Sequence, residues 1–371
     1  MSFAPARWSM DRSMRAARIT GVRSPVEVTV MPVPEIDEDD ALVRVVASGV
    51  CRSDWHIWNG DWVWNGLKLP EWGVLGHEIG GVIDSVGSRV TRVRPGQRVT
   101  VPFHLSCGHC YYCTHGRQNL CEDGASSNLF PGSGGWAQYV RVPNANLNCI
   151  VLPDQVDEVT AAALGCRYMT AWRAMRHQGA ARGGETVAVI GCGGVGLAAV
   201  EIAACLGAEV IAVDVDEAKL ALAMELGARA KINARGLGPE AVGEAVRNLT
   251  TANRGVDVAV DALGLQQTVN AALFSLKKRG RLAQVGLTSQ EEKGFPKIPL
   301  DLMVMNELQI AGSQGNPHWG YDELMTLVAR GRLKPQRLVT REVRLSDIGA
   351  VLHDMDTFKT TGYVIVTDLA A

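Results

Sequence analysis

The sequence lacks the features of a membrane or nucleic-acid protein. It has no apolar stretch near the roughly 18 residues that a membrane-crossing helix needs, and no apolar signal core near its start. It has no long run of either charge, because 37 basic residues are interspersed with 39 acidic ones. Fibrous and low-complexity patterns are also missing. We therefore expect a globular, cytoplasmic protein whose partner is a small molecule.

What the sequence does contain indicates a two-domain enzyme. Its 371 residues, of which 47% are apolar and 40 are glycine, exceed what one hydrophobic core usually supports. Two domains with a ligand-binding cleft between them are the expectation. In a reducing compartment the nine cysteines bind metal or do chemistry more often than they form disulfides.

The sequence pattern that predicts secondary structure changes near Thr160. From about Arg15 to Val151, short β-branched segments alternate with glycine and proline and predict a barrel-like β domain, with strands at 41–46, 80–87 and 97–102. Residues 1–13 are expected to be a loose leader, since the strand-like pattern begins only near Met14. Beyond Thr160, buried strands alternate with helices and predict a doubly wound parallel sheet, with strands starting near 185, 209, 256, 281 and 308. A helix at 321–329 and a strand at 363–367 are expected to return to the β domain.

A glycine-rich turn predicts a dinucleotide site. Gly191-Cys-Gly-Gly-Val-Gly196 lies between a predicted strand and a predicted helix, and Asp214 ends the next strand. The turn allows close approach of a pyrophosphate, and a carboxylate at Asp214 favours NAD over NADP. Asp214 could instead be an ordinary turn carboxylate and Lys219, which could reach the ribose, a solvated helix lysine. A Rossmann methyltransferase shares such a turn. The predicted cofactor-binding residues of this segment are Gly191, Gly193, Gly194, Val195, Gly196, Asp214 and Lys219.

Four cysteines in one loop predict a structural zinc site. Cys107, Cys110, Cys113 and Cys121 follow the pattern C-x2-C-x2-C-x7-C. Four thiolates at this spacing close a tetrahedron and leave no position for substrate. His109 and His115 lie in the same loop and are interpreted as solvated.

A second, dispersed set could hold a catalytic zinc. Two cysteines and a histidine, Cys51, His77 and Cys166, leave a fourth coordination position open. Spacing alone does not distinguish this set from other interpretations, because an isolated Gly-His-Glu is often a turn and an isolated cysteine is often a core residue.

Taken together and in order, these motifs resemble the zinc-containing medium-chain dehydrogenase/reductase family, especially its alcohol dehydrogenases. The resemblance runs from about Met14 to Val366 and rests on G-x-x-x-S-D-x-H around Ser53, Gly76-His-Glu, the cysteine loop, Gly165-Cys166 and the glycine turn with Asp214. It implies a GroES-like β-barrel catalytic domain at 1–167 and 316–371, and a Rossmann NAD-binding domain at 168–315. It also implies two zinc ions per chain and reversible oxidation of a primary or secondary alcohol by hydride transfer to NAD.

The resemblance also implies roles for individual residues. Cys51, His77 and Cys166 are the implied catalytic zinc ligands, with Glu78 as an alternate ligand and Asp54 orienting His77. Ser53 and His56 match the proton relay. Arg52 matches a pyrophosphate-binding arginine and Thr170 a residue beside the nicotinamide. One departure stands near the C-terminus, where Tyr363 follows Gly362 at a position that is often arginine.

The predicted substrate pocket is aromatic. A tryptophan-rich segment from Trp55 to Asn65, together with Trp72, precedes Gly76, and the resemblance puts Trp62 at the substrate and Phe103 facing the cleft. Such walls suit a compact or aromatic alcohol, although some of these rings could serve packing only. Cys166, where polyol dehydrogenases often have glutamate, modestly favours a simple alcohol.

Other functions are compatible with parts of the pattern. A polyol or formaldehyde dehydrogenase on the same scaffold would differ in its pocket, and a non-enzymatic dinucleotide-binding protein would have no reason to keep the zinc ligands together with Ser53 and His56. A zinc-dependent nucleic-acid binder would need a basic surface, which this sequence does not provide. The resemblance implies pairing through an edge strand near Leu308–Gly312 into a homotetramer, or a dimer.

Overall fold

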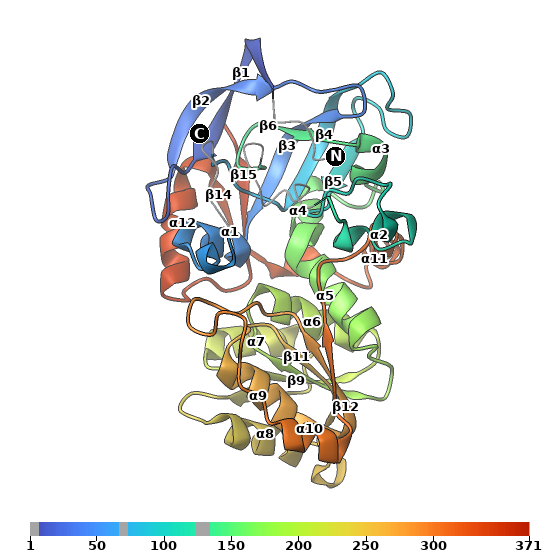
Figure 1. Ribbon diagram of the computed structural model, residues 1–371, viewed down its shortest axis with the longest axis vertical. Helices are drawn as coiled ribbons and strands as arrows, with labels where there is room; N and C mark the ends of the chain where they lie inside the picture. The colour runs from blue at the N-terminus through green and yellow to red at the C-terminus, as the bar shows by residue number, and fades with distance from the viewer. Residues whose placement is uncertain (1–6, 67–72, 124–133, 371) are drawn as a thin grey trace. The chain divides into compact units, whose positions relative to one another are not determined.

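A computed structural model describes residues 7–66, 73–123 and 134–370 (Figure 1). The chain forms two compact units, one of Met1–Met169 with Gly315–Ala371 and the other of Thr170–Gln314. Within the described ranges, no helix combines the length and the apolar character needed to cross a membrane.

The unit of residues 170–314 contains a six-stranded parallel sheet. Its strands run in the order β10-β9-β8-β11-β12-β13. This order, with the first strand in sequence at the centre and a reversal beside it, is that of dinucleotide-binding doubly wound folds, as predicted. The strands are β8 (Thr186–Ile190), β9 (Glu209–Asp214), β10 (Ala230–Asn233), β11 (Val256–Asp261), β12 (Leu276–Gln284) and β13 (Gln309–Gly312).

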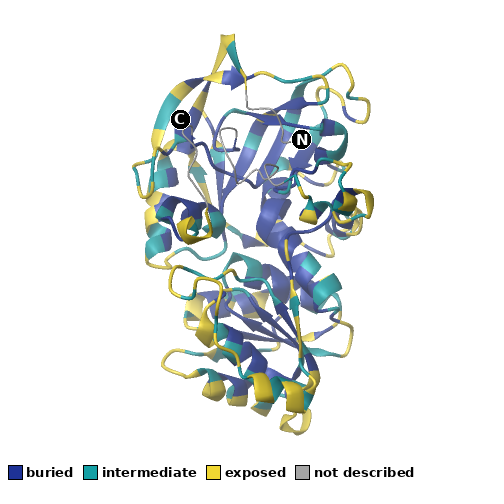
Figure 2. Cartoon of the chain, in the orientation of Figure 1, coloured by how far each residue is buried: buried dark blue, intermediate teal, exposed yellow. Residues whose placement is uncertain are grey.

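Apolar strands form the centre of this unit. Val187, Val189, Val258 and Val260 are fully buried, as expected for strands covered on both faces, and Figure 2 shows the strands dark blue between helices with exposed outer faces. The helices are α5 (Met169–Arg173), which starts at the boundary, α6 (Gly194–Cys205), α7 (Glu217–Glu225), α8 (Pro239–Asn248), α9 (Gln266–Ser275) and α10 (Leu300–Asn306), with a π-helical turn η4 (Ala174–Gln178).

The other unit contains a seven-stranded, largely antiparallel sheet, as predicted for the β domain. Its order is β14-β15-β3-β4-β5-β7, and β6 also pairs with β3. The C-terminal strand β15 is antiparallel to β3, with Val364 opposite Val50, so it lies beside the strand that leads to Cys51. The strands are β3 (Ala41–Val50), β4 (Ile79–Val86), β5 (Arg98–Val101), β6 (Tyr139–Val142), β7 (Ile150–Val151), β14 (Val339–Arg344) and β15 (Tyr363–Asp368).

Short helices flank this sheet. Apolar side chains from the sheet and from helix α12 form one buried cluster that includes Trp58 and Trp136. The helices are α1 (Arg52–Asn59), α2 (Tyr111–Thr114), α3 (Ala145–Asn148), α4 (Glu158–Ala163), α11 (Gly320–Ala329) and α12 (Ile348–Asp356), and a π-helical turn η3 (Leu164–Tyr168) continues α4.

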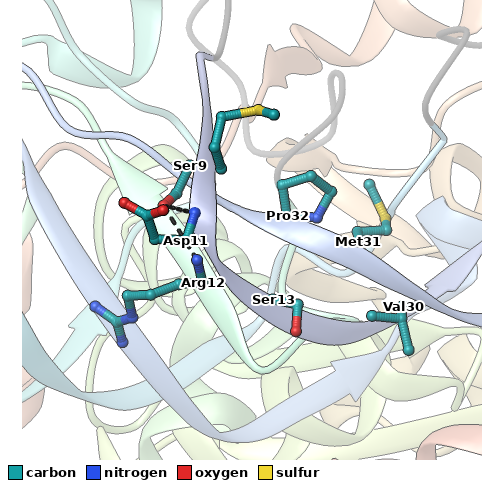
Figure 3. A pocket seen from close by; sticks show the side chains of 8 residues that line it. Ser9, Asp11, Arg12, Ser13, Val30, Met31 and Pro32 are labelled. Atoms are coloured by element: carbon teal, nitrogen blue, oxygen red, sulfur yellow. Dashed lines mark hydrogen bonds between the residues drawn. The ribbon is translucent and has the colours of Figure 1, made fainter.

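The expected loose leader is partly wrong. Strand β1 (Trp8–Arg18) begins well before Met14 and pairs with β2 (Glu27–Pro34), with Trp8 opposite Pro34. The first part of β1 is mostly exposed and lacks the alternation of apolar and polar residues that would predict a strand. It is a strand because β1 pairs with β2. The hollow on this hairpin is lined by 9–13 and 30–32 and contains none of the predicted site residues (Figure 3). Residues 1–6 lie outside the described residues.

Candidate functional site

Three dispersed side chains meet in the first unit. The ligand atoms of Cys51, His77 and Cys166 lie within 4.8 Å of one another, and all three residues are buried. Cys51 follows β3 and is the extended N-cap of α1, His77 immediately precedes β4, and Cys166 sits in the π-helical turn η3. Such π turns inside helices often occur at functional sites. The donor set of two sulfurs and one imidazole nitrogen suits zinc.

His77 is held by one carboxylate. Its Nδ1 is 2.9 Å from Asp54 Oδ1, and the backbone N–H of Cys51 donates to the other oxygen at 2.9 Å. Burial favours the neutral ring, but Asp54 and Cys51 together outweigh it and raise the pKa of His77 well above its usual value. The buried Nε2 of His77 has no hydrogen-bond partner among the described residues. An oriented ring with a bare Nε2 facing two thiols fits a metal ligand whose other nitrogen is fixed by a carboxylate.

Cys51 and Cys166 shift each other's pKa in opposite directions. A hydrogen bond between the two sulfurs is the largest cause that lowers the pKa of Cys51 well below its usual value, and His77 acts in the same direction. The same bond raises the pKa of Cys166 well above its usual value. A bound cation would replace the proton of that bond and favour both thiolates.

Glu78 is engaged by an arginine. Its Oε1 accepts from the Arg167 backbone N–H at 3.1 Å and from Nε at 2.9 Å, and its Oε2 pairs with Nη2 of the same side chain. Burial raises the pKa of Glu78, and Arg167 opposes that rise. The Arg167 guanidinium lies 3.8 Å above the ring of Tyr363, which is fully buried. Glu78 is not part of the group formed by Cys51, His77 and Cys166, so its role as an alternate ligand stays a prediction.

The four loop cysteines converge around a second point. Cys107, Cys110, Cys113 and Cys121 place their sulfurs within 4.8 Å of one another. The backbone N–H of Cys107 donates to Cys121 Sγ, and that of Cys110 to Cys107 Sγ, both at 3.4 Å. These amides stabilise thiolate charge. His109 and His115 are exposed and outside the group. The geometry fits a closed tetrathiolate zinc site.

The two predicted relay residues lie on α1. Ser53 Oγ is 3.9 Å from Cys51 Sγ, beside the candidate metal position. His56 is in the last turn of α1, and its Nδ1 is 2.6 Å from Asp61 Oδ2. The structure therefore places the hydroxyl at the dispersed cysteine site and gives the imidazole a carboxylate partner.

The remaining predicted residues of this unit have aromatic or backbone neighbours. Arg52 donates to the Met355 carbonyl at 2.5 Å and lies 3.5 Å above the ring of Trp55, and burial lowers its pKa to about 10. Phe103 is buried with its ring 5.9 Å from that of His77. Trp62 stacks on His56, with ring centroids 5.0 Å apart. Trp72 lies outside the described residues.

The glycine turn has the shape that the motif predicts. Gly191 has φ +90°, and a Cβ at Gly196 would stand 1.8 Å from the Gly191 carbonyl oxygen, so side chains at these two positions are excluded. A Cβ at Gly193, the N-cap of α6, would meet nothing within 4 Å. Open space at a helix N-terminus fits a pyrophosphate. Gly194, Val195 and Gly196 form the first turn of α6.

Asp214 holds this turn from the next strand. Its Oδ2 accepts from the Cys192 backbone N–H at 2.6 Å, and its Oδ1 from those of Val215 and Asp216 at 2.7 and 3.0 Å. The carboxylate thus has a structural task in addition to any ribose contact. Lys219 in α7 and Thr170 in α5 are both buried, so Lys219 is not the solvated helix lysine considered as an alternative.

Two charged residues that the motifs did not single out belong to these sites. Arg167 follows a predicted ligand in an otherwise apolar segment, and a buried arginine there needs an anionic partner. Asp61 follows the glycine that ends α1, where the chain turns back toward His56. In both cases the signal was a charge in an apolar setting next to a motif residue.

Comparison with known proteins gives consistent matches along the chain. Residues 37–154 match the family model "Alcohol dehydrogenase GroES-like domain", and residues 194–330 match "Zinc-binding dehydrogenase". An NAD-dependent alcohol dehydrogenase of Sulfurisphaera tokodaii is 32% identical, covering 94% of this chain and 98% of its own. A sorbitol dehydrogenase of Bacillus subtilis is 32% identical, covering 91% and 92%. The solved structure of alcohol dehydrogenase TADH from Thermus sp. ATN1 is 32% identical with a TM-score of 0.85, covering 96% and 100%.

Proposed function

This chain belongs to the zinc-containing alcohol dehydrogenases of the medium-chain dehydrogenase/reductase family, and we propose that it reversibly oxidises a small primary or secondary alcohol. The hydride acceptor is NAD, and two zinc ions are held per chain. The observation that carries the proposal is the convergence of Cys51, His77 and Cys166 around the unpartnered Nε2 of His77. A protein that only bound a dinucleotide would have no use for that set.

The catalytic zinc would be held by Cys51, His77 and Cys166, and the second zinc by the four loop cysteines. When bound, the first metal supplies Lewis acidity for the substrate oxygen, and NAD supplies the hydride-accepting carbon. Asp54 fixes the orientation of the His77 ring, which sets the direction of its lone pair. Glu78, paired with Arg167, places a buried carboxylate close to this set without joining it and is our candidate for an alternate ligand.

Ser53 and His56 handle the alcohol proton. The Ser53 hydroxyl lies beside Cys51, where it can accept the proton of a substrate hydroxyl and pass on its own. His56 is partly exposed, so it can return a proton to solvent. We assign Ser53 to the substrate end of the relay and His56 to its solvent end.

The cofactor would be held by the second unit. Gly193 leaves room for the pyrophosphate at the start of α6, in a tight turn that requires Gly191 and Gly196, and Asp214 presents a carboxylate that disfavours a 2′-phosphate. We assign Lys219 to the ribose, Thr170 to the nicotinamide and Arg52 to the pyrophosphate. Phe103, next to His77, and Trp62 are our candidates for the substrate pocket.

A polyol dehydrogenase is the second candidate function. The similarity to a sorbitol dehydrogenase of Bacillus subtilis, over nine-tenths of both chains, favours it. Cys166 in place of the glutamate that polyol dehydrogenases often use, and the aromatic surroundings of the site, favour a simple or aromatic alcohol instead.

We further propose a cytoplasmic homotetramer, with a dimer as the alternative. Strand β13 is an edge of its sheet and is mostly exposed, and α10, which precedes it, exposes Leu300, Val304 and Met305. Apolar side chains beside an open edge suit pairing with a second copy. None of the described cysteines forms a disulfide, which is compatible with a reducing compartment.

One experiment tests the proposal. Zinc is counted per chain, and absorbance at 340 nm is followed with NAD or NADP and primary, secondary, benzylic and polyol substrates. We expect the wild-type protein to hold two zinc ions and to turn over alcohols with NAD. Cys51→Ala and His77→Ala should each lose that turnover and one of the two zinc ions. A protein that keeps only the loop zinc and turns over no substrate would overturn the catalytic site. Preferential turnover of polyols would favour the second candidate.

A further inference from the structure

We infer that Asp61 is a positioning residue of the proton relay, which holds the imidazole of His56 in the tautomer whose Nε2 is free to accept a proton. The inference rests on the proposed function, in which His56 delivers the proton to solvent. It is carried by the short contact between the two side chains and by the turn that creates it.

The contact is built into the end of helix α1. Asp61 Oδ2 is 2.6 Å from His56 Nδ1, and its Oδ1 accepts from Asn59 Nδ2 at 2.7 Å. The backbone N–H of Asp61 also donates to the His56 carbonyl at 2.9 Å. Gly60 makes the turn possible, since its φ is +78° and a Cβ there would stand 3.0 Å from the Val22 side chain. Both carboxylate oxygens are therefore engaged, and one of them faces His56.

Two rings complete the frame around the imidazole. Trp62 stacks on His56 at 5.0 Å with an interplanar angle of 24°, and Trp55 meets it edge-on at 5.1 Å. The side chains of His56 and Asp61 are 20% and 11% exposed, which leaves the imidazole a path to water while the carboxylate is mostly covered. A stacked ring and one fixed nitrogen leave the imidazole little freedom to rotate.

The charges around the pair keep Asp61 ionised. Burial raises the pKa of Asp61, but His56, Asn59 and Arg52 together lower it below its usual value. Arg23 bonds Asn59 Oδ1 and pairs with Asp356, which also accepts from Trp55 and lies 3.4 Å from His353. Besides His56, the cations that interact with Asp61 are Arg52 and Arg23, and Arg23 connects it to Asp356 and His353. An ionised Asp61 can only accept, so His56 Nδ1 carries the proton of the shared bond.

The chemistry follows from that bond. With the proton on Nδ1, Nε2 has a free lone pair that can take the proton that Ser53 passes on from the alcohol. The resulting imidazolium is stabilised by the Asp61 carboxylate and then loses one proton from Nε2 to water, so the pair returns to its starting state. Asp61 stays ionised throughout, as the carboxylate does in other aspartate-oriented histidine bases.

Two substitutions separate this role from simple packing. In Asp61→Asn the amide Nδ2 faces His56 and donates to Nδ1, which forces the proton onto Nε2 and blocks the acceptor. Asp61→Ala removes the carboxylate but leaves both tautomers accessible. With zinc and NAD bound, we expect kcat for alcohol oxidation near pH 7 to fall about 10–100-fold in Asp61→Asn and clearly less in Asp61→Ala, with KM values nearly unchanged. A larger loss in alanine than in the isosteric asparagine would overturn the inference.

A double-mutant cycle ties the effect to His56. In His56→Gln, Asp61→Asn should cost nothing further, whereas an undiminished loss would assign Asp61 to the fold or to Arg52. Unchanged turnover in His56→Gln would show that His56 does not relay the proton, and this would overturn the inference. Asp84→Asn, a matched change on strand β4 at a carboxylate that pairs with Arg12, is the control and should keep wild-type activity.

A readout that needs no turnover distinguishes failure of the inference from failure of the proposed function. In zinc-loaded protein with ¹⁵N-labelled histidine, the His56 signals, assigned by their loss in His56→Gln, should show protonated Nδ1 and unprotonated Nε2. In Asp61→Asn the pattern should invert. A wild-type protein with the proton on Nε2 would overturn the inference even if the enzyme oxidises alcohols.

Discussion

One carboxylate connects two candidate ligands of the dispersed cysteine site: Asp54 Oδ1 lies 2.9 Å from His77 Nδ1, while Asp54 Oδ2 accepts from the backbone N–H of Cys51 at 2.9 Å. Asp54 is fully buried and also accepts from the Gly76 backbone N–H at 3.2 Å. The ligand that starts helix α1 and the ligand that precedes β4 are therefore set by the same side chain.

Replacing this carboxylate should weaken one metal site only. In Asp54→Asn we expect the catalytic site to bind zinc about 10–100-fold more weakly, because the negative charge beside His77 is lost and the amide NH2 must face either the His77 ring or the Cys51 backbone N–H. Chelator competition measures both sites in one titration. The loop site of Cys107, Cys110, Cys113 and Cys121 serves as the internal control, and equal weakening of both sites would mean that the substitution damages the whole unit.

The buried pair of Glu78 and Arg167 makes a prediction about stability. Arg167→Met leaves an uncompensated buried carboxylate, so unfolding free energy should fall by roughly 3–5 kcal/mol. Urea unfolding of the zinc-loaded protein gives the value. Adding Glu78→Gln to Arg167→Met should recover much of the loss, and failure to do so would show that the guanidinium matters for its packing on Tyr363. Arg344→Met, at an exposed pair with Asp347, is the control and should change little.

Asp214 makes a prediction about cofactor choice. Asp214→Ala removes the carboxylate that would repel a 2′-phosphate, so the ratio of kcat/KM for NAD to that for NADP should fall by at least about tenfold. The ratio is informative because loosening of the glycine turn at Cys192 lowers both values equally. Asp216→Ala removes the side chain that caps α7 at Ala218 and should leave the ratio unchanged. An unchanged ratio in Asp214→Ala would assign Asp214 to the turn alone.

His318 makes the stability of its unit depend on pH. It is buried, its Nε2 is 3.1 Å from Asn148 Oδ1, and burial lowers its pKa to about 4. Because the unfolded pKa is about 6.5, the unfolded chain binds more protons between these values, so stability is complete above pH 6.5 and falls as the pH drops toward 4. At pH 5 the free energy of unfolding should be lower than at neutral pH by on the order of 2 kcal/mol.

Urea unfolding at pH 7.5 and pH 5 measures this dependence. His318→Gln cannot take up the proton, so it should be less stable than wild type at pH 7.5 but show a smaller drop between the two pH values. A drop as large as that of the wild type would assign the acid sensitivity to other groups, such as buried His104, whose pKa burial lowers to about 3.

The sequence predicted elements best where a long apolar run or a dense motif was present. The parallel strands β8, β9 and β11 are mostly buried and were visible as short, predominantly apolar runs. Strand β12 begins at Leu276, before its predicted start at Arg281, because its first part is Lys277-Lys-Arg and carries no apolar signal. The half-exposed strands β10 and β14 were missed for the same reason, since backbone pairing alone identifies them.

The sequence predicted the candidate metal ligands better than it predicted the residues that hold the site's side chains in place. Cys51, His77 and Cys166 stand in recognisable motifs, but Asp61 and Arg167 act through contacts that depend on a glycine-made turn and on a π-helical turn. No spacing rule gives those turns. Trp62 is a further example, since its ring lies against His56, a contact that the motif did not indicate.

The two cysteine clusters differ in how far apart their members lie along the chain. All four loop cysteines come from one short segment around α2, whereas Cys51 and Cys166 come from the strand β3 side and the end of α4. Closing a short loop costs less chain entropy than joining distant segments. The loop can therefore capture its ion while the protein is still being synthesised, and the dispersed cluster can do so only after its domain has folded. During biogenesis the two metal ions would then be acquired in a fixed order, with the structural ion first.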